Sequence, residues 1–74
     1  MSYGDFLDLF YRSDKPPELR LGQFFMNELY RVNPKIYHMI PAGLDPYYDD
    51  KLLNQCIDWI AHRSHLWEDD DNET

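Results

Sequence analysis

The fold of this chain is decided by residues 17–32, which read Pro17-Glu18-Leu19-Arg20-Leu21-Gly22-Gln23-Phe24-Phe25-Met26-Asn27-Glu28-Leu29-Tyr30-Arg31-Val32. Apolar residues recur three or four positions apart in this stretch, and Leu21, Phe25, Leu29 and Val32 form one stripe, as in an amphipathic helix. Proline at a first helical position and glutamate in the first turn are start signals, so we expect a helix over residues 17–32. Gly22 costs such a helix about 1 kcal/mol relative to alanine, and it would permit a close backbone approach by a neighbour.

Working outward, the same signals predict three more helices, over residues 4–12, over residues 34–40 and from Asp49 or Asp50 to about residue 63. Paired prolines interrupt the chain before residue 18, and Pro41 to Gly43 stop the third helix. We expect residues 44–48 to be an ordered loop, and the segment after the last helix to fold back and bury Trp67. The predicted class is all-α, with three main helices and one short helix.

Composition limits the function classes. The chain has 74 residues, 12 of them aromatic, and a formal net charge of -7, which argues against a nucleic-acid binder with a basic face. Residues 68–74 hold five acids and no base, so residues 1–67 carry a net charge of only -2. We therefore expect one domain over residues 1–67 and a disordered acidic tail over residues 68–74.

We expect no signal peptide, and the sequence has no apolar run long enough for a membrane span. Cys56 is the single cysteine, so no intramolecular disulfide can form and a reducing cytoplasm is the natural setting. We expect a cytoplasmic protein without membrane contact.

Three carboxylates, those of Asp45, Asp49 and Asp50, flank two tyrosines in the predicted loop. Carboxylates are ligands for Ca²⁺ or Mg²⁺, but the spacing lacks the alternation, central glycine and closing glutamate of an EF-hand loop. The favoured interpretation is helix capping and turn formation.

The histidines and the cysteine give no stronger signal for chemistry. His38, His62 and His65 could join Cys56 in a zinc site, but no C-x-x-C pair is present, and His62 suits a helix C-terminus. Cys56 lies on the apolar face of the last helix, where a cysteine usually acts as a small hydrophobic residue. We predict no catalytic residue, no metal and no cofactor, and we expect that the chain is not an enzyme.

Tyrosines remain as candidates for a contact surface, because tyrosine and methionine are enriched at protein interfaces. A second candidate is the acidic tail, which either only keeps the chain soluble or acts as an anionic arm that competes for a basic, nucleic-acid-binding groove on another protein. The predicted partner-binding residues are Tyr37, Met39, Tyr47, Tyr48, Asp49, Asp50, Glu68, Asp69, Asp70 and Asp71.

Two segments carry a resemblance to a known group. Residues 20–29 fit R-x-G-Q-x-φ-x-N-x-L, and residues 45–50 fit D-P-[FY]-[YH]-x-D before a last helix that ends near a tryptophan. Over residues 19–67 the chain resembles small, mostly uncharacterised proteins of tailed bacteriophages. Gln23 and Asn27 lie four apart on one helix face, so we expect both to hydrogen-bond the Asp45-Pro46 loop and fix the Tyr47–Tyr48 pair.

The resemblance implies a phage origin and carries no activity. Together with the tyrosines and the charge, it favours a non-catalytic protein that docks on a host or phage protein in the host cytoplasm and blocks or redirects it. A nuclease, a polymerase or a defence complex is the kind of host target we expect, with no direct nucleic-acid contact. The alternative is a structural or accessory phage protein that forms a homo-oligomer through its aromatic face.

Overall fold

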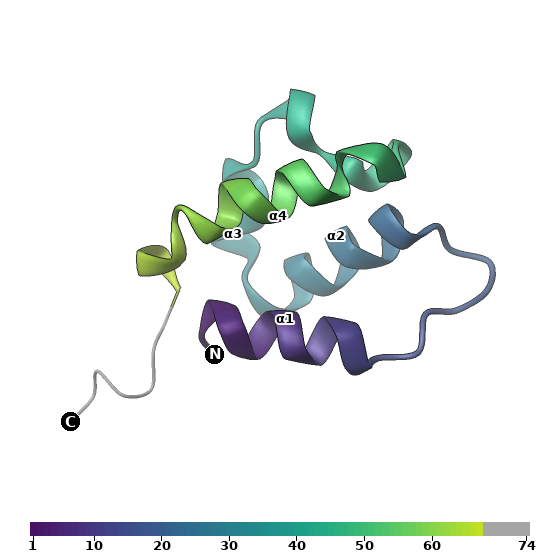
Figure 1. Cartoon of the computed structure of the whole chain (residues 1–74), viewed down its shortest axis with the longest axis horizontal. Helices are drawn as coiled ribbons and strands as arrows, with labels where there is room; N and C mark the ends of the chain where they lie inside the picture. Colours follow the sequence, from purple (N-terminus) through teal and green to yellow (C-terminus); the bar gives the residue numbers. More distant parts are fainter. Residues whose placement is uncertain (68–74) are drawn as a thin grey trace.

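The structure is a computed structural model that describes residues 1–67, and all regular elements in that range are helical (Figure 1). This confirms the predicted helical class. Residues 68–74, which include the predicted acidic tail, lie outside the described residues. The α-helices are α1 (Tyr3–Arg12), α2 (Leu21–Val32), α3 (Pro34–Met39) and α4 (Leu53–Ala61), and the 3-10 turns are η1 (Ala42–Leu44), η2 (Pro46–Tyr48), η3 (Asp50–Leu52) and η4 (Ser64–Leu66).

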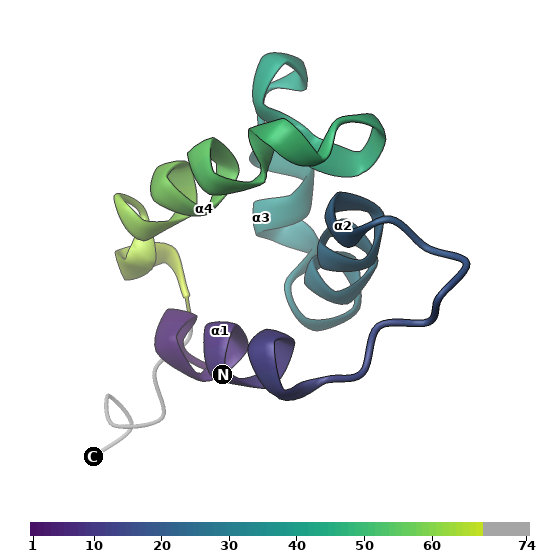
Figure 2. The ribbon, with the colours of Figure 1, turned by 45° about the vertical axis from the view of Figure 1, so that its right-hand side comes forward.

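Helix α2 is the centre of the fold and contacts α1, α3, η2 and η3. Helices α1 and α2 run in opposite directions and are joined by an extended linker, while the turns between α3 and α4 pass over the beginning of α2 (Figures 1 and 2). The apolar stripe predicted for α2 faces inward at Phe25 and Leu29, which are fully buried, but Leu21 is 42% exposed. The buried core consists of Phe6, Phe10, Phe24, Phe25, Met26, Leu29, Ile36, Leu53, Cys56, Ile60 and Trp67.

The start of α2 differs from the expectation that it begins at residue 17. Pro17 and its neighbours form a turn in which the Leu19 amide donates to the Pro16 carbonyl. The backbone of Arg20 is still extended, and its N–H donates to the Gln23 side-chain oxygen at 3.3 Å. That contact replaces a missing intrahelical partner and sets the helix start at Leu21.

The last helix also starts later than expected. Asp49 caps the turn η3, because its carboxylate accepts from the Lys51 amide at 3.0 Å, and α4 itself begins only at Leu53 and ends at Ala61. Asp50 accepts a hydrogen bond from α2 and is therefore held in the turn. The tertiary contact tightens this segment into a 3-10 turn that a local helix signal did not predict.

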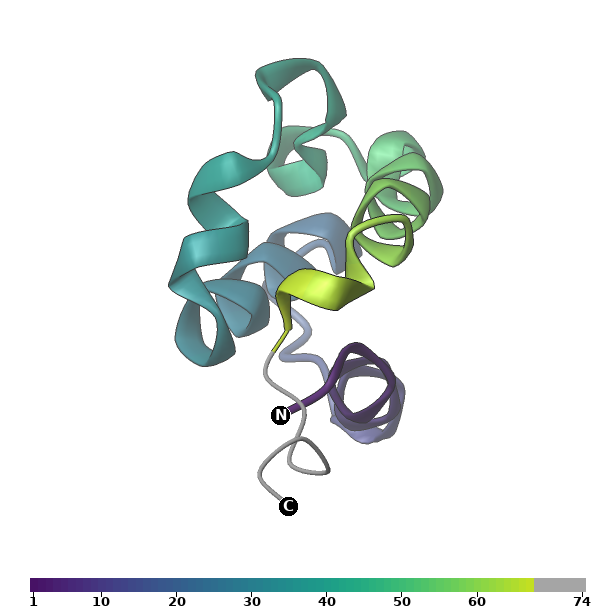
Figure 3. The ribbon, with the colours of Figure 1, turned by 90° about the vertical axis from the view of Figure 1, so that its left-hand side faces the viewer.

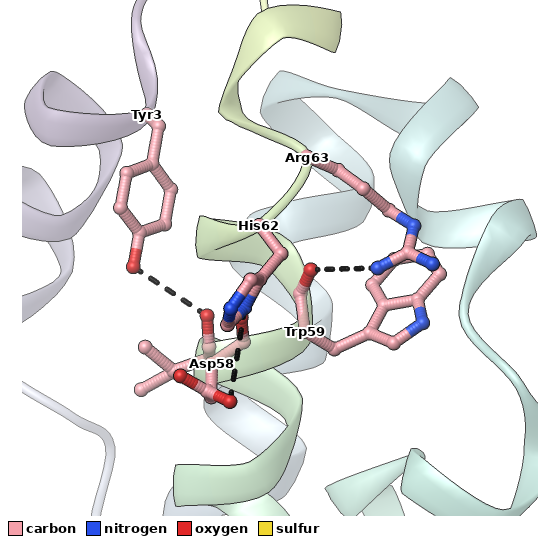
Figure 4. A network of polar contacts seen from close by, with 6 residues as sticks. Tyr3, Asp58, Trp59, His62 and Arg63 are labelled. Atoms are coloured by element: carbon pink, nitrogen blue, oxygen red, sulfur yellow. Dashed lines mark hydrogen bonds and ion pairs between the residues drawn. The ribbon is translucent and has the colours of Figure 1, made fainter.

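The predicted return of the chain after α4 is confirmed. Trp67 is 5% exposed, and its ring stacks on Phe6 with centroids 5.2 Å apart and meets Tyr3 edge-on at 6.2 Å. In Figures 1, 2 and 3 the segment that follows α4 ends beside the start of α1. The Tyr3 hydroxyl also reaches the Ile57 carbonyl through a long hydrogen bond of 3.5 Å, and burial raises the pKa of this phenol (Figure 4). Aromatic packing thus ties both ends of the described chain together.

Candidate protein-interaction surface

A close backbone contact joins the beginning of α2 to the turn η2. Gly22 is buried, and a Cβ placed on it would overlap the Pro46 carbonyl oxygen and lie 2.9 Å from the Pro46 carbonyl carbon. The Gly22 N–H donates to the Asp50 carboxylate at 2.9 Å. The predicted close approach at Gly22 is therefore confirmed, and it depends on the missing side chain rather than on an unusual backbone angle.

Tyr47 is fixed next to this contact by three hydrogen bonds. Its hydroxyl accepts from the Gln23 amide at 3.1 Å, its carbonyl accepts from the Arg20 guanidinium at 2.9 Å, and its N–H donates to the Asp45 carboxylate at 2.8 Å. The prediction for Gln23 is confirmed in part, because its side chain bonds the neighbouring Tyr47 rather than Asp45 or Pro46. The prediction for Asn27 is wrong, because Asn27 is exposed and hydrogen-bonds through its side chain to none of residues 1–67.

Residues 20–29 and residues 45–50, far apart in the sequence, thus meet in three dimensions. We call this contact the α2 joint. It consists of Arg20, Gly22 and Gln23 from one segment and Asp45, Pro46, Tyr47 and Asp50 from the other. Each of these residues has a structural role in holding the turns against α2.

The hydrogen bonds of the three loop carboxylates also bear on the two interpretations of the acidic loop. Asp45, Asp49 and Asp50 each accept a backbone N–H, from Tyr47, Lys51 and Gly22 respectively. The capping interpretation is therefore confirmed. Within residues 1–67 there is no group of three or more histidine, cysteine, aspartate or glutamate side chains that could hold a metal ion.

A second aromatic group lies at the other end of α2. Tyr30 of α2 meets Tyr37 of α3 with ring centroids 4.9 Å apart, and His38 is edge-on to both rings. Tyr30 is 54% exposed, whereas Tyr37 is half-buried behind it. Tyr30 is not among the residues predicted to bind a partner, although its position seven residues after Gln23 places both on one helix face.

One face of α2 connects the two aromatic groups. Gln23, Asn27 and Tyr30 are spaced four and three residues apart, so they lie above one another along about 10 Å of helix. At the Gln23 end Tyr47 packs against Tyr48, with centroids 4.8 Å apart, and Tyr48 is 83% exposed. We call this surface the tyrosine strip; it consists of Tyr48, Tyr47, Gln23, Asn27, Tyr30 and Tyr37.

The strip contains three of the ten residues predicted to bind a partner, namely Tyr37, Tyr47 and Tyr48. Met39 is 45% exposed at the end of α3, next to His38. Asp49 and Asp50 follow Tyr48, but their carboxylates bond backbone amides of the fold. The remaining four, Glu68, Asp69, Asp70 and Asp71, lie outside the described residues.

Cys56, the candidate nucleophile, lies in the hydrophobic core. Cys56 is fully buried, and desolvation raises the pKa of its thiol to about 12, which removes the thiolate needed for nucleophilic chemistry. This confirms the core role expected for Cys56.

His62 and Arg63 at the end of α4 interact with that helix itself (Figure 4). The His62 ring nitrogen lies 2.8 Å from the Asp58 carbonyl oxygen and 3.8 Å from the Asp58 carboxylate. The Arg63 guanidinium lies 4.0 Å from the centre of the Trp59 ring and donates to the Trp59 carbonyl. These contacts satisfy the last carbonyl groups of the helix, as predicted for His62.

Comparisons of the chain with protein-family models, with curated proteins and with solved structures gave no match. Among residues 1–67, no helix has the length and apolar character needed to cross a bilayer.

Proposed function

We propose that this chain is a non-catalytic docking module that binds another protein through the tyrosine strip. The main support is the exposure of Tyr48 and Tyr30, 83% and 54%, at the two ends of one helix face. Tyrosine supplies a large amphipathic contact area with few rotatable bonds, which is why it is enriched in binding surfaces. Tyr47 and Tyr37 hold these two exposed rings from behind, so little conformational entropy is lost on binding.

The character of the strip favours a different protein over a second copy as the partner. Interfaces between identical subunits are more apolar, whereas this strip carries hydroxyl and amide groups beside its rings. Each chain also has a formal net charge of -7, which opposes close self-association.

The same charge favours a partner with a basic surface. Five acids lie in residues 68–74, so most of the negative charge belongs to one short segment of sequence. Charges at the edge of an interface mainly accelerate association and strengthen its dependence on salt. We therefore assign to Glu68, Asp69, Asp70 and Asp71 a steering role rather than a share of the close contact.

In the phage setting that the resemblance implies, such binding would block or redirect a host protein in the host cytoplasm. A basic partner surface fits a host nuclease, polymerase or defence complex, since these bind nucleic acid through basic surfaces.

The proposal is tested by affinity capture from a host lysate with three matched baits. These are the wild-type chain, the double variant Tyr30→Ala with Tyr48→Ala, and Leu66→Ala as an exposed apolar control, because Leu66 is 36% exposed and lies outside the tyrosine strip. We expect a protein that the wild type and the Leu66 variant retain and the double variant loses. Identical captures by all three baits would refute the tyrosine strip as the contact surface.

Light scattering after size exclusion tests the alternative of self-assembly. A monomer is expected. A stable oligomer of the wild type, with a monomeric double variant, would instead establish the strip as an interface between copies.

A further inference from the structure

We propose that the fold carries a second binding site, a groove where the end of α1 meets the beginnings of α2 and α4, and that it takes an apolar side chain of a partner polypeptide followed by a carboxylate. This inference does not depend on the tyrosine strip. It rests on the shape of the groove, on its apolar wall and on one cation at its edge.

The groove is open and has a volume of about 270 Å³. Its wall contains Phe10, Phe24 and Leu53, three core side chains that are each at least 93% buried. Leu21 and Tyr11 border it and are 42% and 67% exposed. Pockets that enclose a whole small ligand have volumes of roughly 300 Å³ or more, so this one suits one or two inserted side chains rather than a cofactor.

The polar groups of Ser13 at the groove are bonded within the fold, whereas the exposed Asn54 side chain at its border makes no hydrogen bond to residues 1–67. The Ser13 hydroxyl donates to the Leu9 carbonyl at 2.7 Å, and the Ser13 N–H also bonds to the end of α1. A polar side chain inserted next to Ser13 would lose its hydration without gaining that partner, so the wall selects an apolar anchor.

The charge at the groove is positive. Lys15 borders it, and its ammonium group donates to the carbonyls of Leu19 and Pro16 at 2.7 and 3.3 Å. No carboxylate of residues 1–67 lies within 4.0 Å of this ammonium group. An ammonium has three donors, and the third is available for a carboxylate of the partner. The complement of this groove is therefore an apolar side chain with an acid next to it in the sequence.

The groove and the tyrosine strip lie on different sides of α2. Leu21 and Phe24 line the groove, whereas Gln23, Asn27 and Tyr30 lie in the strip. At the angular step of an α-helix these two sets point roughly 120° apart. Both surfaces are accessible at the same time, so a chain of this size has room to bridge two polypeptides.

Binding is tested by following the backbone amide signals of the ¹⁵N-labelled full chain by NMR during titration with two probe peptides. The first is the acetylated pentapeptide alanine-leucine-phenylalanine-glutamate-alanine, and the second has lysine in place of glutamate. We expect chemical-shift changes confined to residues around Phe10, Leu21 and Leu53, with a Kd on the order of 1 mM for a single anchor. Shift changes scattered over the surface, or none at peptide concentrations well above that Kd, would overturn the site.

The charge argument is tested by the ratio of the two affinities. An exposed ion pair strengthens binding by about two- to five-fold, so we expect the glutamate peptide to bind more tightly than the lysine peptide by that factor at low salt. At high salt the two peptides should bind with equal affinity. Lys15→Gln should remove the preference. Lys35→Gln is the matched control, because Lys35 is an exposed lysine beside a separate hollow with Asn33 and Leu66. Equal affinities in the wild type, or loss of the preference in both variants, would refute the role of Lys15.

The apolar part is tested by Leu21→Gln, which changes a half-exposed side chain and should weaken both peptides several-fold. If this variant fails to fold, Tyr11→Ser at the opposite border serves the same purpose. The Tyr48→Ala variant should bind both peptides as the wild type does, and a loss of binding in that variant would place the site elsewhere.

Discussion

Replacing Gly22 with alanine should destabilise the chain, although the same change stabilises most helices. In a helix interior alanine is favoured over glycine by about 1 kcal/mol. Here the added methyl group would overlap the Pro46 carbonyl oxygen and lie 2.9 Å from the carbonyl carbon, so the Pro46 carbonyl group would have to retreat by roughly 1 Å to reach ordinary van der Waals separation. The local propensity and the tertiary contact therefore have opposite signs at this residue.

The expected loss of stability follows from the contacts that a displacement of Pro46 would disturb. Overpacking of a well-packed contact costs about 1–3 kcal/mol, and moving η2 also strains the hydrogen bonds from Arg20 and Gln23 to Tyr47, each worth about 1 kcal/mol. After the gain in helix propensity, we expect a net loss of about 2–3 kcal/mol in the free energy of unfolding. A chain of this length has roughly 4–11 kcal/mol in total, so the loss is a large part of the stability.

Urea unfolding followed by circular dichroism measures this loss, and Gly4→Ala is the matched control. Gly4 lies in α1, and the nearest heavy atom to an added Cβ would be the Ser2 hydroxyl oxygen at 4.0 Å, so that variant should be neutral or gain up to about 1 kcal/mol. Hydrogen exchange at residues 46–50 should also become faster in the Gly22 variant. A Gly22→Ala chain as stable as the wild type would refute the close approach on which the α2 joint depends.

Three further changes have defined outcomes. In urea unfolding Gln23→Ala should cost about 1 kcal/mol through its lost bond to Tyr47, whereas Asn27→Ala on the same face should stay within about 0.5 kcal/mol of wild type. Burial raises the pKa of the Cys56 thiol from 9.0 to about 12, so only the unfolded chain loses this proton between those pH values. The free energy of unfolding should therefore fall by up to about 1.4 kcal/mol per pH unit in that range. Urea unfolding at several pH values should show a smaller fall in Cys56→Ala. Phe6→Ala should cost about 3–5 kcal/mol and leave a chain that is partly unfolded at 25 °C by circular dichroism, because Phe6 is fully buried among three other rings.

Periodicity and stop signals predicted the helices well where local chemistry sets their ends. Asn33 followed by Pro34 begins α3 as expected, since the Asn33 side chain accepts from the Ile36 amide and proline needs no partner at a first position. The start of α2 was wrong by four residues, because Pro17-Glu18 is an equally good local start and only the bonds of Arg20 to Gln23 and Tyr47 favour the later one.

The contact surface was predicted only in part, because tertiary contacts that the sequence does not show decide which side chains reach η2. Spacing identified Gln23 and Asn27 as one helix face, but spacing alone does not say which of them reaches η2. Gln23 lies in the first turn of α2, beside the close contact at Gly22, and Asn27 is one turn further along and exposed. Tyr30 was missed because its partner Tyr37 follows a helix reversal at Asn33, and the direction of α3 after that reversal is not visible in the sequence.

The pattern on which the resemblance to phage proteins rests contributes residues to both the α2 joint and the tyrosine strip. Seven residues of the pattern on which the resemblance rests meet in the α2 joint, whereas two others, Asn27 and Tyr48, are exposed in the strip together with Tyr30. A joint of this kind fixes Tyr47, and thus the ring of Tyr48 packed against it, relative to α2, and the rigid helix fixes the distance from there to Tyr30. In the proposed function the pattern therefore specifies the spacing of the two exposed tyrosines, and partner choice depends on the exposed side chains between and around them.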